Sequence, residues 1–238
     1  MKVSVIALTW NRLNGLGATL LKLSNQTYKD FDVHISNGNL KKTNTVDKYC
    51  NAFKDKLNIS VYHEGNDNFA FRRMTLARDL AKSGSDIILF IDDDVDFPEN
   101  YIENCISQYE PNTYKSCYAW YFTSNVDYYM GRHRVKTNDK PVHYAGTGLG
   151  MVDAKIFLED GLFDVPECAY QVEDLWLSYY ADHVMGWSLG WIENSNTTVG
   201  GRDKVALSRT VRVAGCNKND FFSELTINYG WKPAITVG

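Results

Sequence analysis

Residues 87–94 read Ile87-Ile88-Leu89-Phe90-Ile91-Asp92-Asp93-Asp94, which places three carboxylates directly behind an apolar run. The length and composition of the run are typical of a buried strand. Adjacent carboxylates at the end of such a strand repel one another and lose hydration, so the protein alone gains no stability from them. A divalent cation reverses this balance, because Mg²⁺ and Mn²⁺ bind carboxylate oxygens together with phosphate oxygens of a substrate. The other interpretation is a solvated acidic turn or a helix N-terminus, and the motifs elsewhere in the chain favour the cation.

Strand-like and helix-like segments alternate through the first hundred residues. The expected strands share short apolar runs and lie at 3–8, 31–35, 58–62 and 87–90. The expected helices share apolar residues at three- and four-residue spacing and lie at about 16–25, 45–57 and 69–82. This alternation predicts an α/β fold with a Rossmann-like, mainly parallel sheet flanked by helices. In such sheets ligands bind beyond the carboxyl ends of the strands, where the polar clusters of this sequence lie.

The composition is that of an ordinary globular protein. The 238 residues suffice for one large domain or two small ones with a sizeable core. A net charge of −4 provides no electrostatic footprint for nucleic acid or anionic membranes, so no nucleic-acid partner is expected. No apolar stretch approaches the roughly 20 residues of a transmembrane helix, which predicts no integral membrane segment. The first residues begin directly on a strand, so no secretory signal is expected.

The cysteines indicate reduced thiols. They are odd in number, dispersed and without CxxC spacing, at Cys50, Cys105, Cys117, Cys168 and Cys216. This distribution argues against a disulfide framework or a zinc site and predicts a cytoplasmic location. The histidines His133, His143 and His183 do not show zinc-like spacing either.

Segments of the first half resemble a known family. Residues 3–12 are similar to the opening strand and loop of the family 2 glycosyltransferases of the GT-A fold. The turn after the second strand is similar to the base-recognition turn of that family, with Asn37 where Asp is usual. Residues 76–79 resemble its Ala-Arg-Asn stretch. Asp92 and Asp94 resemble the two acidic positions of its DxD motif.

The second half carries further matches in the expected order. Residues 144–152 resemble the glycine-rich acceptor-side segment, where glycines allow close backbone approach to the donor sugar. Residues 161–164 are similar to the Gly-Gly-Phe-Asp that follows it, and residues 173–178 resemble the Glu-Asp pair that opens a helix and supplies the catalytic base. The resemblance covers about residues 3–190, and residues 191–238 carry no recognised motif.

The resemblance implies a metal-dependent, inverting glycosyltransferase. It would move a sugar from a nucleotide-diphosphate sugar, with a UDP-sugar favoured, to a hydroxyl of a glycan or glycoconjugate acceptor. Asp94 and Asp92 would hold Mn²⁺ or Mg²⁺, and Asp174 would be the catalytic base. The donor-binding positions implied are Thr9, Asn11, Arg12, Asn37, Arg78, Asp92, Asp93 and Gly148. The acceptor-side positions implied are Glu173 and Trp176.

The expected organisation is a single GT-A domain over residues 1–238. Residues 1–96 would form the half that binds the nucleotide sugar. Residues 97–238 would form the half with the acceptor site and the catalytic base, together with a C-terminal tail.

Some positions keep a second interpretation. Arg78 is either a residue that binds the diphosphate or shapes the site, or a surface charge. Asp174 is either the base or a helix N-cap. The glycine-rich loop 200–204 is either a lid whose basic residues meet the diphosphate or a turn. The aromatic residues around Trp176 fit core packing better than a sugar platform.

Other functions fit the sequence less well. A phosphotransferase of the haloacid dehalogenase type also places a DxD after a strand, but it needs Thr or Val where Asp96 stands here. A sugar nucleotidyltransferase would carry a glycine-rich, basic loop after the first strand, which residues 9–12 do not provide. The non-enzyme alternative is a catalytically degenerate GT-A domain that binds sugar nucleotides or acts as a scaffold, and the intact acidic residues at both motifs argue against it.

Overall fold

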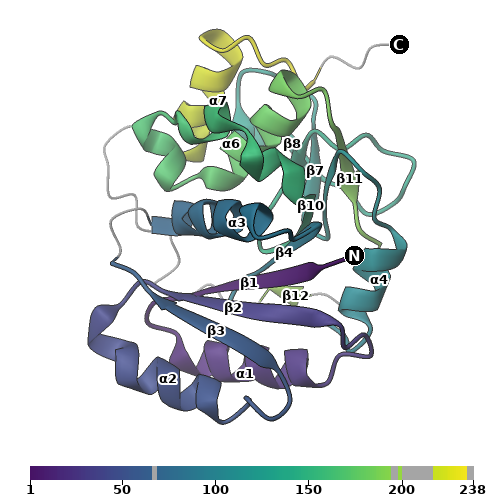
Figure 1. Cartoon of the computed structure of the whole chain (residues 1–238). Coiled ribbons are helices and arrows are strands. Elements are labelled where there is room, and N and C mark those ends of the chain that lie inside the picture. Colours follow the sequence, from purple (N-terminus) through teal and green to yellow (C-terminus); the bar gives the residue numbers. More distant parts are fainter. Residues whose placement is uncertain (66–68, 194–197, 200–216, 235–238) are drawn as a thin grey trace.

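A seven-stranded sheet forms the centre of the computed structural model, which describes residues 1–65, 69–193, 198–199 and 217–234. The strands lie in the order β11-β6-β10-β4-β1-β2-β3 (Figure 1). Their bounds are β1 Val3–Thr9, β2 Phe31–Asn37, β3 Asn58–His63, β4 Ile87–Ile91, β6 Thr113–Ser116, β10 Leu149–Asp153 and β11 Ser188–Trp191. Only β10 runs antiparallel to its neighbours, so the sheet is mainly parallel, as the sequence predicts.

The described residues also form two smaller sheets and several helices. One small sheet pairs β5 Val95–Asp96 with β12 Thr198–Val199, and the other consists of β7 Ala119–Phe122, β8 Arg132–Arg134 and β9 Tyr144–Ala145. The α-helices are α1 Leu13–Ser24, α2 Thr43–Asn51, α3 Arg72–Lys82, α4 Tyr101–Ser107, α5 Tyr128–Gly131, α6 Glu173–Tyr179 and α7 Lys218–Ile227. Short 3-10 turns lie at Leu40–Lys42, Phe69–Phe71, Ala154–Leu158, Asp160–Phe163 and Glu167–Tyr170, and a π-helix lies at Tyr180–Val184.

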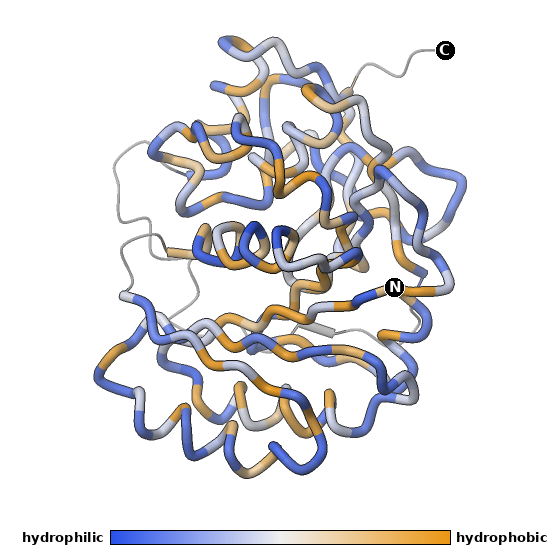
Figure 2. The backbone as a smooth tube through the Cα atoms, in the orientation of Figure 1, coloured by the Kyte–Doolittle hydropathy of each residue, from blue (hydrophilic) through white to orange (hydrophobic). Residues whose placement is uncertain are grey.

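Helices cover both faces of the central sheet. In Figure 1, α1 and α2 lie on one side of β1 to β3, and α3 lies on the other side together with α6 and α7. Side chains alternate along β4, so Ile88 and Phe90 join the core on the α3 side whereas Leu89 joins the core on the α1 side. Figure 2 shows apolar residues concentrated along the central strands. Burial of this apolar surface is the main force that holds the two layers of helices on the sheet.

The expected α/β fold is confirmed, and the boundaries of two expected helices are corrected. The helix expected at 45–57 is found at Thr43–Asn51, with turns after it. The helix expected at 69–82 begins only at Arg72. Phe69 has a φ of 44°, in the left-handed region that an α-helix cannot include, and a short 3-10 turn links it to α3.

The cysteines depart from the expectation at one position. Cys50, Cys105 and Cys117 are buried free thiols, as expected. Cys168 is disulfide-bonded, which corrects the prediction of reduced thiols throughout the chain. Spacing in the sequence does not reveal such a bond, because its formation depends on the distance between Cα atoms in the folded chain.

Two further expectations concern the membrane and the loop 200–204. Across the part of the chain that the structure describes, every helix is too short or too polar to cross a membrane. The loop 200–204, expected as a lid or a turn, lies outside the described residues.

Candidate active site

The carboxyl ends of four parallel strands meet at one edge of the sheet. Thr9 at the end of β1 pairs in register with Asn37 at the end of β2, and Asn37 pairs with His63 at the end of β3. On the other side of β1, β4 ends at Ile91 and is followed by the acidic triplet. The order of strands reverses between β1 and β4, which is where ligands bind in open α/β sheets.

Two arginines balance the three carboxylates of the triplet. Arg12 Nη1 lies 2.8 Å from Asp93 Oδ1 and 3.0 Å from Asp94 Oδ2, and Arg73 Nη2 donates to Asp92 Oδ1 at 2.8 Å. The Asp92 and Asp94 side chains keep 34% and 22% of their surface exposed, against 12% for Asp93. Burial raises the pKa of Asp93 to about 6, although Arg12 acts in the opposite direction. The outer two carboxylates are therefore the accessible ones.

Arg73 joins the acidic triplet to the start of α6. Its Nε lies 3.3 Å from Glu173 Oε1, and its Nη1 donates to the Thr147 carbonyl at 3.2 Å. Burial lowers the pKa of Arg73, but Asp92 and Glu173 more than reverse this effect and hold it above its ordinary value. Burial raises the pKa of Glu173 to about 7. Glu173, expected on the acceptor side, is 4% exposed and pairs with Arg73 rather than lying on an open surface.

Arg78, expected at the donor site, lies elsewhere. Its guanidinium pairs with Asp160 and lies 4.4 Å from the centre of the Phe163 ring. Arg73 and Arg78 are five residues apart, which turns them by about 140° around the helix axis. The structure therefore brings Arg73, and not Arg78, to the acidic triplet.

Asn37 shapes the turn after β2 from within. Its side chain is fully buried, and its Nδ2 lies 3.1 Å from both the Asn39 carbonyl and His63 Nδ1. Its Oδ1 accepts from the Asn39 N–H at 3.0 Å. These bonds use both N–H groups of the amide, so the structure shows the buried Asn37 side chain holding its own turn, and its direct contact with the donor stays a prediction. The more exposed contact of this turn is between Asn39 Nδ2 and Asn11 Oδ1, at 2.7 Å.

Thr9 is also buried, and its contribution comes through the backbone. Its carbonyl accepts from Arg72 Nη2 at 2.9 Å and from the Gly38 N–H at 3.0 Å. A Cβ on Gly38 would lie 1.8 Å from Arg72 Nη1, so only glycine leaves room for this guanidinium. Burial lowers the pKa of Arg72 to about 10. Arg72 thus fixes the turns after β1 and β2 against each other.

The glycine-rich segment approaches the triplet through Gly148. Its carbonyl accepts from the Asp92 N–H at 2.9 Å. A Cβ at this position would lie 3.1 Å from Asp92 Oδ2 and 3.4 Å from the Tyr118 ring. The structure thus places the Gly148 backbone against Asp92, and its approach to the donor sugar stays a prediction.

Asp174, the expected base, accepts three hydrogen bonds. Its Oδ2 accepts from the Tyr144 hydroxyl and from the Lys218 ammonium at the start of α7, and its Oδ1 accepts from the Leu175 N–H at 3.0 Å. Burial alone would raise the pKa of Asp174, but Lys218 and Tyr144 outweigh it and hold the pKa below its ordinary value. The side chain is 14% exposed. Asp174 is therefore an ionised carboxylate with limited access to solvent.

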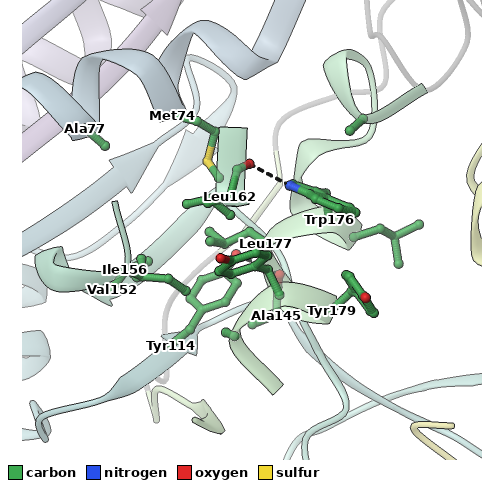
Figure 3. Close-up of a cluster of buried hydrophobic side chains, with 14 of the residues drawn as sticks. Met74, Ala77, Tyr114, Ala145, Val152, Ile156, Leu162, Trp176, Leu177 and Tyr179 are labelled. Carbon is green, nitrogen blue, oxygen red and sulfur yellow. Dashed lines mark hydrogen bonds between the residues drawn. The ribbon is translucent and has the colours of Figure 1, made fainter. Parts of the chain in front are cut away.

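Trp176 belongs to the core. Figure 3 shows its indole N–H donating to the carbonyl of Leu162, at 2.9 Å, among buried side chains from several elements. Its ring centre lies 5.3 Å from that of Tyr179, and 4% of its surface is exposed. The acceptor-side position implied for Trp176 is therefore corrected, because a satisfied indole in this packing presents no face to a ligand.

The acidic triplet suits a cation whose coordination shell is completed by oxygens of a substrate. Within the described ranges, no group of three or more His, Cys, Asp or Glu side chains is arranged to hold a metal ion. Asp92 and Asp94 supply hard carboxylate oxygens with partial exposure. Mg²⁺ and Mn²⁺ bind one or two carboxylates together with substrate phosphates and water, so the residues present fit such an ion.

The model of the family "Glycosyl transferase family 2" matches residues 4–158. The chain belongs to this family. The sequence resemblance to it is thereby confirmed, and with it the GT-A fold. No curated protein matches the chain.

Solved structures resemble this family 2 chain in fold. The mannosyltransferase PcManGT from Pyrobaculum calidifontis, in complex with GDP-Man and Mn²⁺, is 16% identical with a TM-score of 0.59, over 79% of this chain and 54% of that one. TarS 1–349 from S. aureus, in complex with UDP-GlcNAc, is 14% identical with a TM-score of 0.58, over 88% and 61%. The chain thus spans little more than half of these proteins.

A nucleotidyltransferase also shares the fold of the family 2 chain. A putative glucose-1-phosphate thymidylyltransferase from Bacillus anthracis, in complex with a sucrose, is 16% identical with a TM-score of 0.51, over 83% of this chain and 89% of that one. The fold alone therefore does not distinguish a glycosyltransferase from a nucleotidyltransferase. The match to the family 2 model makes this distinction.

The site contains residues that the sequence reasoning missed. They are Asn39, Arg72, Arg73, Tyr144 and Lys218. The helical period carries a signal for Arg73, because it lies four residues before Ala77 and therefore shares the buried face of α3. Lys218 had no signal, since it lies in the part of the chain without a recognised motif.

Proposed function

We propose that this chain is a metal-dependent, inverting glycosyltransferase that uses a nucleoside-diphosphate sugar, with a UDP-sugar favoured. The observation that carries the proposal is the buried Arg73, which contacts both Asp92 of the triplet and Glu173 beside the base. One guanidinium thereby holds Asp92 of the triplet at a fixed distance from Glu173, the residue directly before Asp174. Such fixed spacing is what a reaction between two bound substrates requires.

The donor would bind along the carboxyl edge of β1, β2 and β4. Asp92 and Asp94 would hold Mn²⁺ or Mg²⁺, which supplies positive charge to stabilise the departing nucleoside diphosphate. Asn11 and Asn39 carry amides that can both donate to and accept from a base edge. Arg12 and Asp93 lie beside them, and Thr9 and Asn37 support this surface from beneath.

The acceptor would bind beside Asp174. The acceptor hydroxyl would donate its hydrogen bond to Asp174 and lose its proton to this carboxylate as the oxygen attacks the anomeric carbon. Lys218 and Tyr144 keep Asp174 ionised and oriented before the acceptor arrives. A single displacement of this kind inverts the anomeric configuration. Glu173 is buried under Arg73, which argues against its use as a nucleophile in a retaining mechanism.

One observation favours the alternative of a domain that binds sugar nucleotides without catalysis. The ion pair between Lys218 and Asp174 occupies Oδ2 of the expected base, and Oδ1 already accepts from the Leu175 N–H. Catalysis requires the acceptor to reach Oδ1 beside this bond, or Lys218 to release Oδ2. A domain that only binds sugar nucleotides does not require an acceptor to reach the Asp174 carboxylate.

The test is a screen of nucleotide sugars for Mn²⁺-dependent binding and hydrolysis, each measured with and without EDTA. We expect one donor to bind and to hydrolyse slowly, and EDTA to abolish both. Binding without hydrolysis, and without transfer to any sugar acceptor, would favour the binding domain. Equal binding with and without EDTA would contradict the metal dependence.

A further inference from the structure

Two arginines of β8 lie over aromatic rings on one face of the small sheet. The Arg132 guanidinium carbon lies 4.6 Å from the centre of the Tyr128 ring and 5.2 Å from that of Trp120. The Arg134 guanidinium carbon lies 4.5 Å from the Tyr118 ring centre and 5.5 Å from Trp120. Trp120 is half-buried, and its ring is in contact range of both guanidinium groups. Both cations are thus held against one strip of aromatic side chains.

Neither arginine has a carboxylate partner among the residues that the structure describes. Arg132 Nη1 donates to the Tyr128 hydroxyl at 2.6 Å, and Arg134 Nη2 donates to the Cys117 carbonyl at 3.1 Å. The protein as a whole has a net charge of −4, so the positive charges of Arg132 and Arg134 are opposite in sign to that of the protein. Burial also lowers the pKa of Arg134. Arg132 is half-buried and Arg134 as a whole is exposed, so an anion can reach two guanidinium groups whose charges no carboxylate of the described residues pairs with.

The aromatic strip contacts a residue that binds Asp174, the expected base. The Trp120 ring stacks on that of Tyr144 at 5.0 Å, and the Tyr144 hydroxyl donates to Asp174. The Lys218 ammonium lies 5.8 Å from the centre of the same Tyr128 ring that Arg132 covers. The arginines therefore lie one ring away from the groups that surround the base.

We propose that Arg132 and Arg134 bind a phosphate group on the acceptor while Trp120 contacts its sugar ring. This inference rests on the proposed glycosyltransferase function. A phosphate offers several oxygens and up to two charges, which match the donors of two adjacent guanidinium groups. A carboxylate has only two oxygens and one charge, so a single guanidinium group suffices to bind it. An apolar sugar face can pack against the indole.

The phosphate can belong to a soluble sugar or to a lipid. Tyr129 and Met130 precede Arg132 and are 56% and 82% exposed, so a lipid chain would find apolar contacts beside the subsite. Glucose 6-phosphate and farnesyl phosphate are probes for the two carriers. Glucose is the matched probe without phosphate, and glucuronate is the carboxylate probe.

The experiment measures binding of these probes to the full chain by ligand-observed NMR. We expect both phosphorylated probes to bind at least about tenfold more tightly than glucose or glucuronate. The stronger of the two identifies the carrier. The double variant R132Q/R134Q should lose this preference. The control K136Q/K140Q removes the same charge from exposed lysines of the next segment and should keep it.

Three outcomes would overturn the proposal: equal binding of glucose and glucose 6-phosphate, a preference retained in R132Q/R134Q, or an equal loss in K136Q/K140Q. If R132Q/R134Q does not fold, R132K/R134K keeps the charge but removes the forked donors, and it should weaken phosphate binding. An unchanged affinity in that variant would also refute the subsite.

The same variants separate this proposal from the proposed function. Metal-dependent binding of nucleotide sugars should be equal in wild type and R132Q/R134Q. Its loss in the variant would assign the arginines to the donor diphosphate and overturn an acceptor role. Phosphate-selective binding in a wild-type protein that binds no nucleotide sugar would leave the subsite intact and refute the proposed function.

Discussion

The proposed donor side and the proposed acceptor side of the candidate site are built differently. On the donor side, the acidic triplet and the turns after β1 and β2 follow directly from strands of one parallel sheet. On the acceptor side, Asp174 depends on Tyr144 and on Lys218, which lies 44 residues away in the chain. The donor side balances its charges internally through Arg12 and Arg73, whereas the acceptor side holds cations over aromatic rings. The first arrangement is set by sheet topology and the second by packing between distant segments.

The strongest test of this contrast is Asp94→Ala. We expect it to abolish metal-dependent nucleotide binding, because it removes an accessible carboxylate that the phosphates cannot replace. Calorimetry with the screened nucleotide and Mn²⁺ measures the loss. The control is Asp96→Ala, two residues further on, where the exposed carboxylate pairs with Lys22 instead. Similar affinities for the two variants would exclude the triplet as the metal site.

On the acceptor side, Asp174→Asn should lower the transfer rate by about 10²–10⁴-fold and leave donor affinity unchanged. The amide keeps the size of the carboxylate and can still accept from Lys218, but it cannot take the acceptor proton. Steady-state kinetics give the rate, and proton NMR of the wild-type product gives the anomeric configuration. A retained configuration would refute the single displacement, whatever the rate of the variant.

The link between the two sides is tested by Arg73→Met. Removing this buried cation leaves Asp92 and Glu173 without their partner, which should cost about 3–5 kcal/mol of unfolding free energy. The matched control on the same helix is Arg78→Met, whose partner Asp160 is 92% exposed, and its loss should be about 1 kcal/mol or less. Urea denaturation compares them. Equal losses would mean that Arg73 is not the link between the two sides.

Within the donor side, Asn37→Ala should reduce the unfolding free energy by about 1–3 kcal/mol, because the buried turn loses its internal hydrogen bonds. Asn11→Ala should instead weaken nucleotide binding and leave stability nearly unchanged, since Asn11 is exposed. Thermal unfolding with and without nucleotide measures both. The reverse pattern would return base recognition to Asn37.

The smallest effect is expected for Lys218→Met, which should shift the pH dependence of the transfer rate. Lys218 helps to hold the pKa of Asp174 below its ordinary value, so the ionised carboxylate persists to lower pH and is lost only as the pH falls through that folded-state pKa. Without Lys218, burial dominates and raises the pKa. The acidic limb of the rate profile should therefore move to higher pH. An unmoved limb would show that Lys218 does not tune the base.

Much of the donor side was predictable from sequence. The period of apolar residues predicts the strands and helices, and parallel strands place their carboxyl ends at one edge. The positions of Asp92, Asp94 and Arg12 near one another follow from this rule, whereas Gly148 joins them because it precedes the antiparallel strand β10. The burial of Asn37 could not be predicted in this way. A polar residue at a strand end has the same sequence pattern whether its side chain faces solvent or bonds within its own turn.

The sequence by itself determined the α/β order, the family and the position of the acidic triplet, because each is encoded in residues that are close together in the chain. Tertiary structure alone decided that Arg73 rather than Arg78 reaches the triplet and that Lys218 covers Asp174. It also decided that Glu173 and Trp176 are buried. The physical reason is that the role of a charge or an indole depends on which distant groups desolvate and pair with it. Local sequence patterns do not specify these groups.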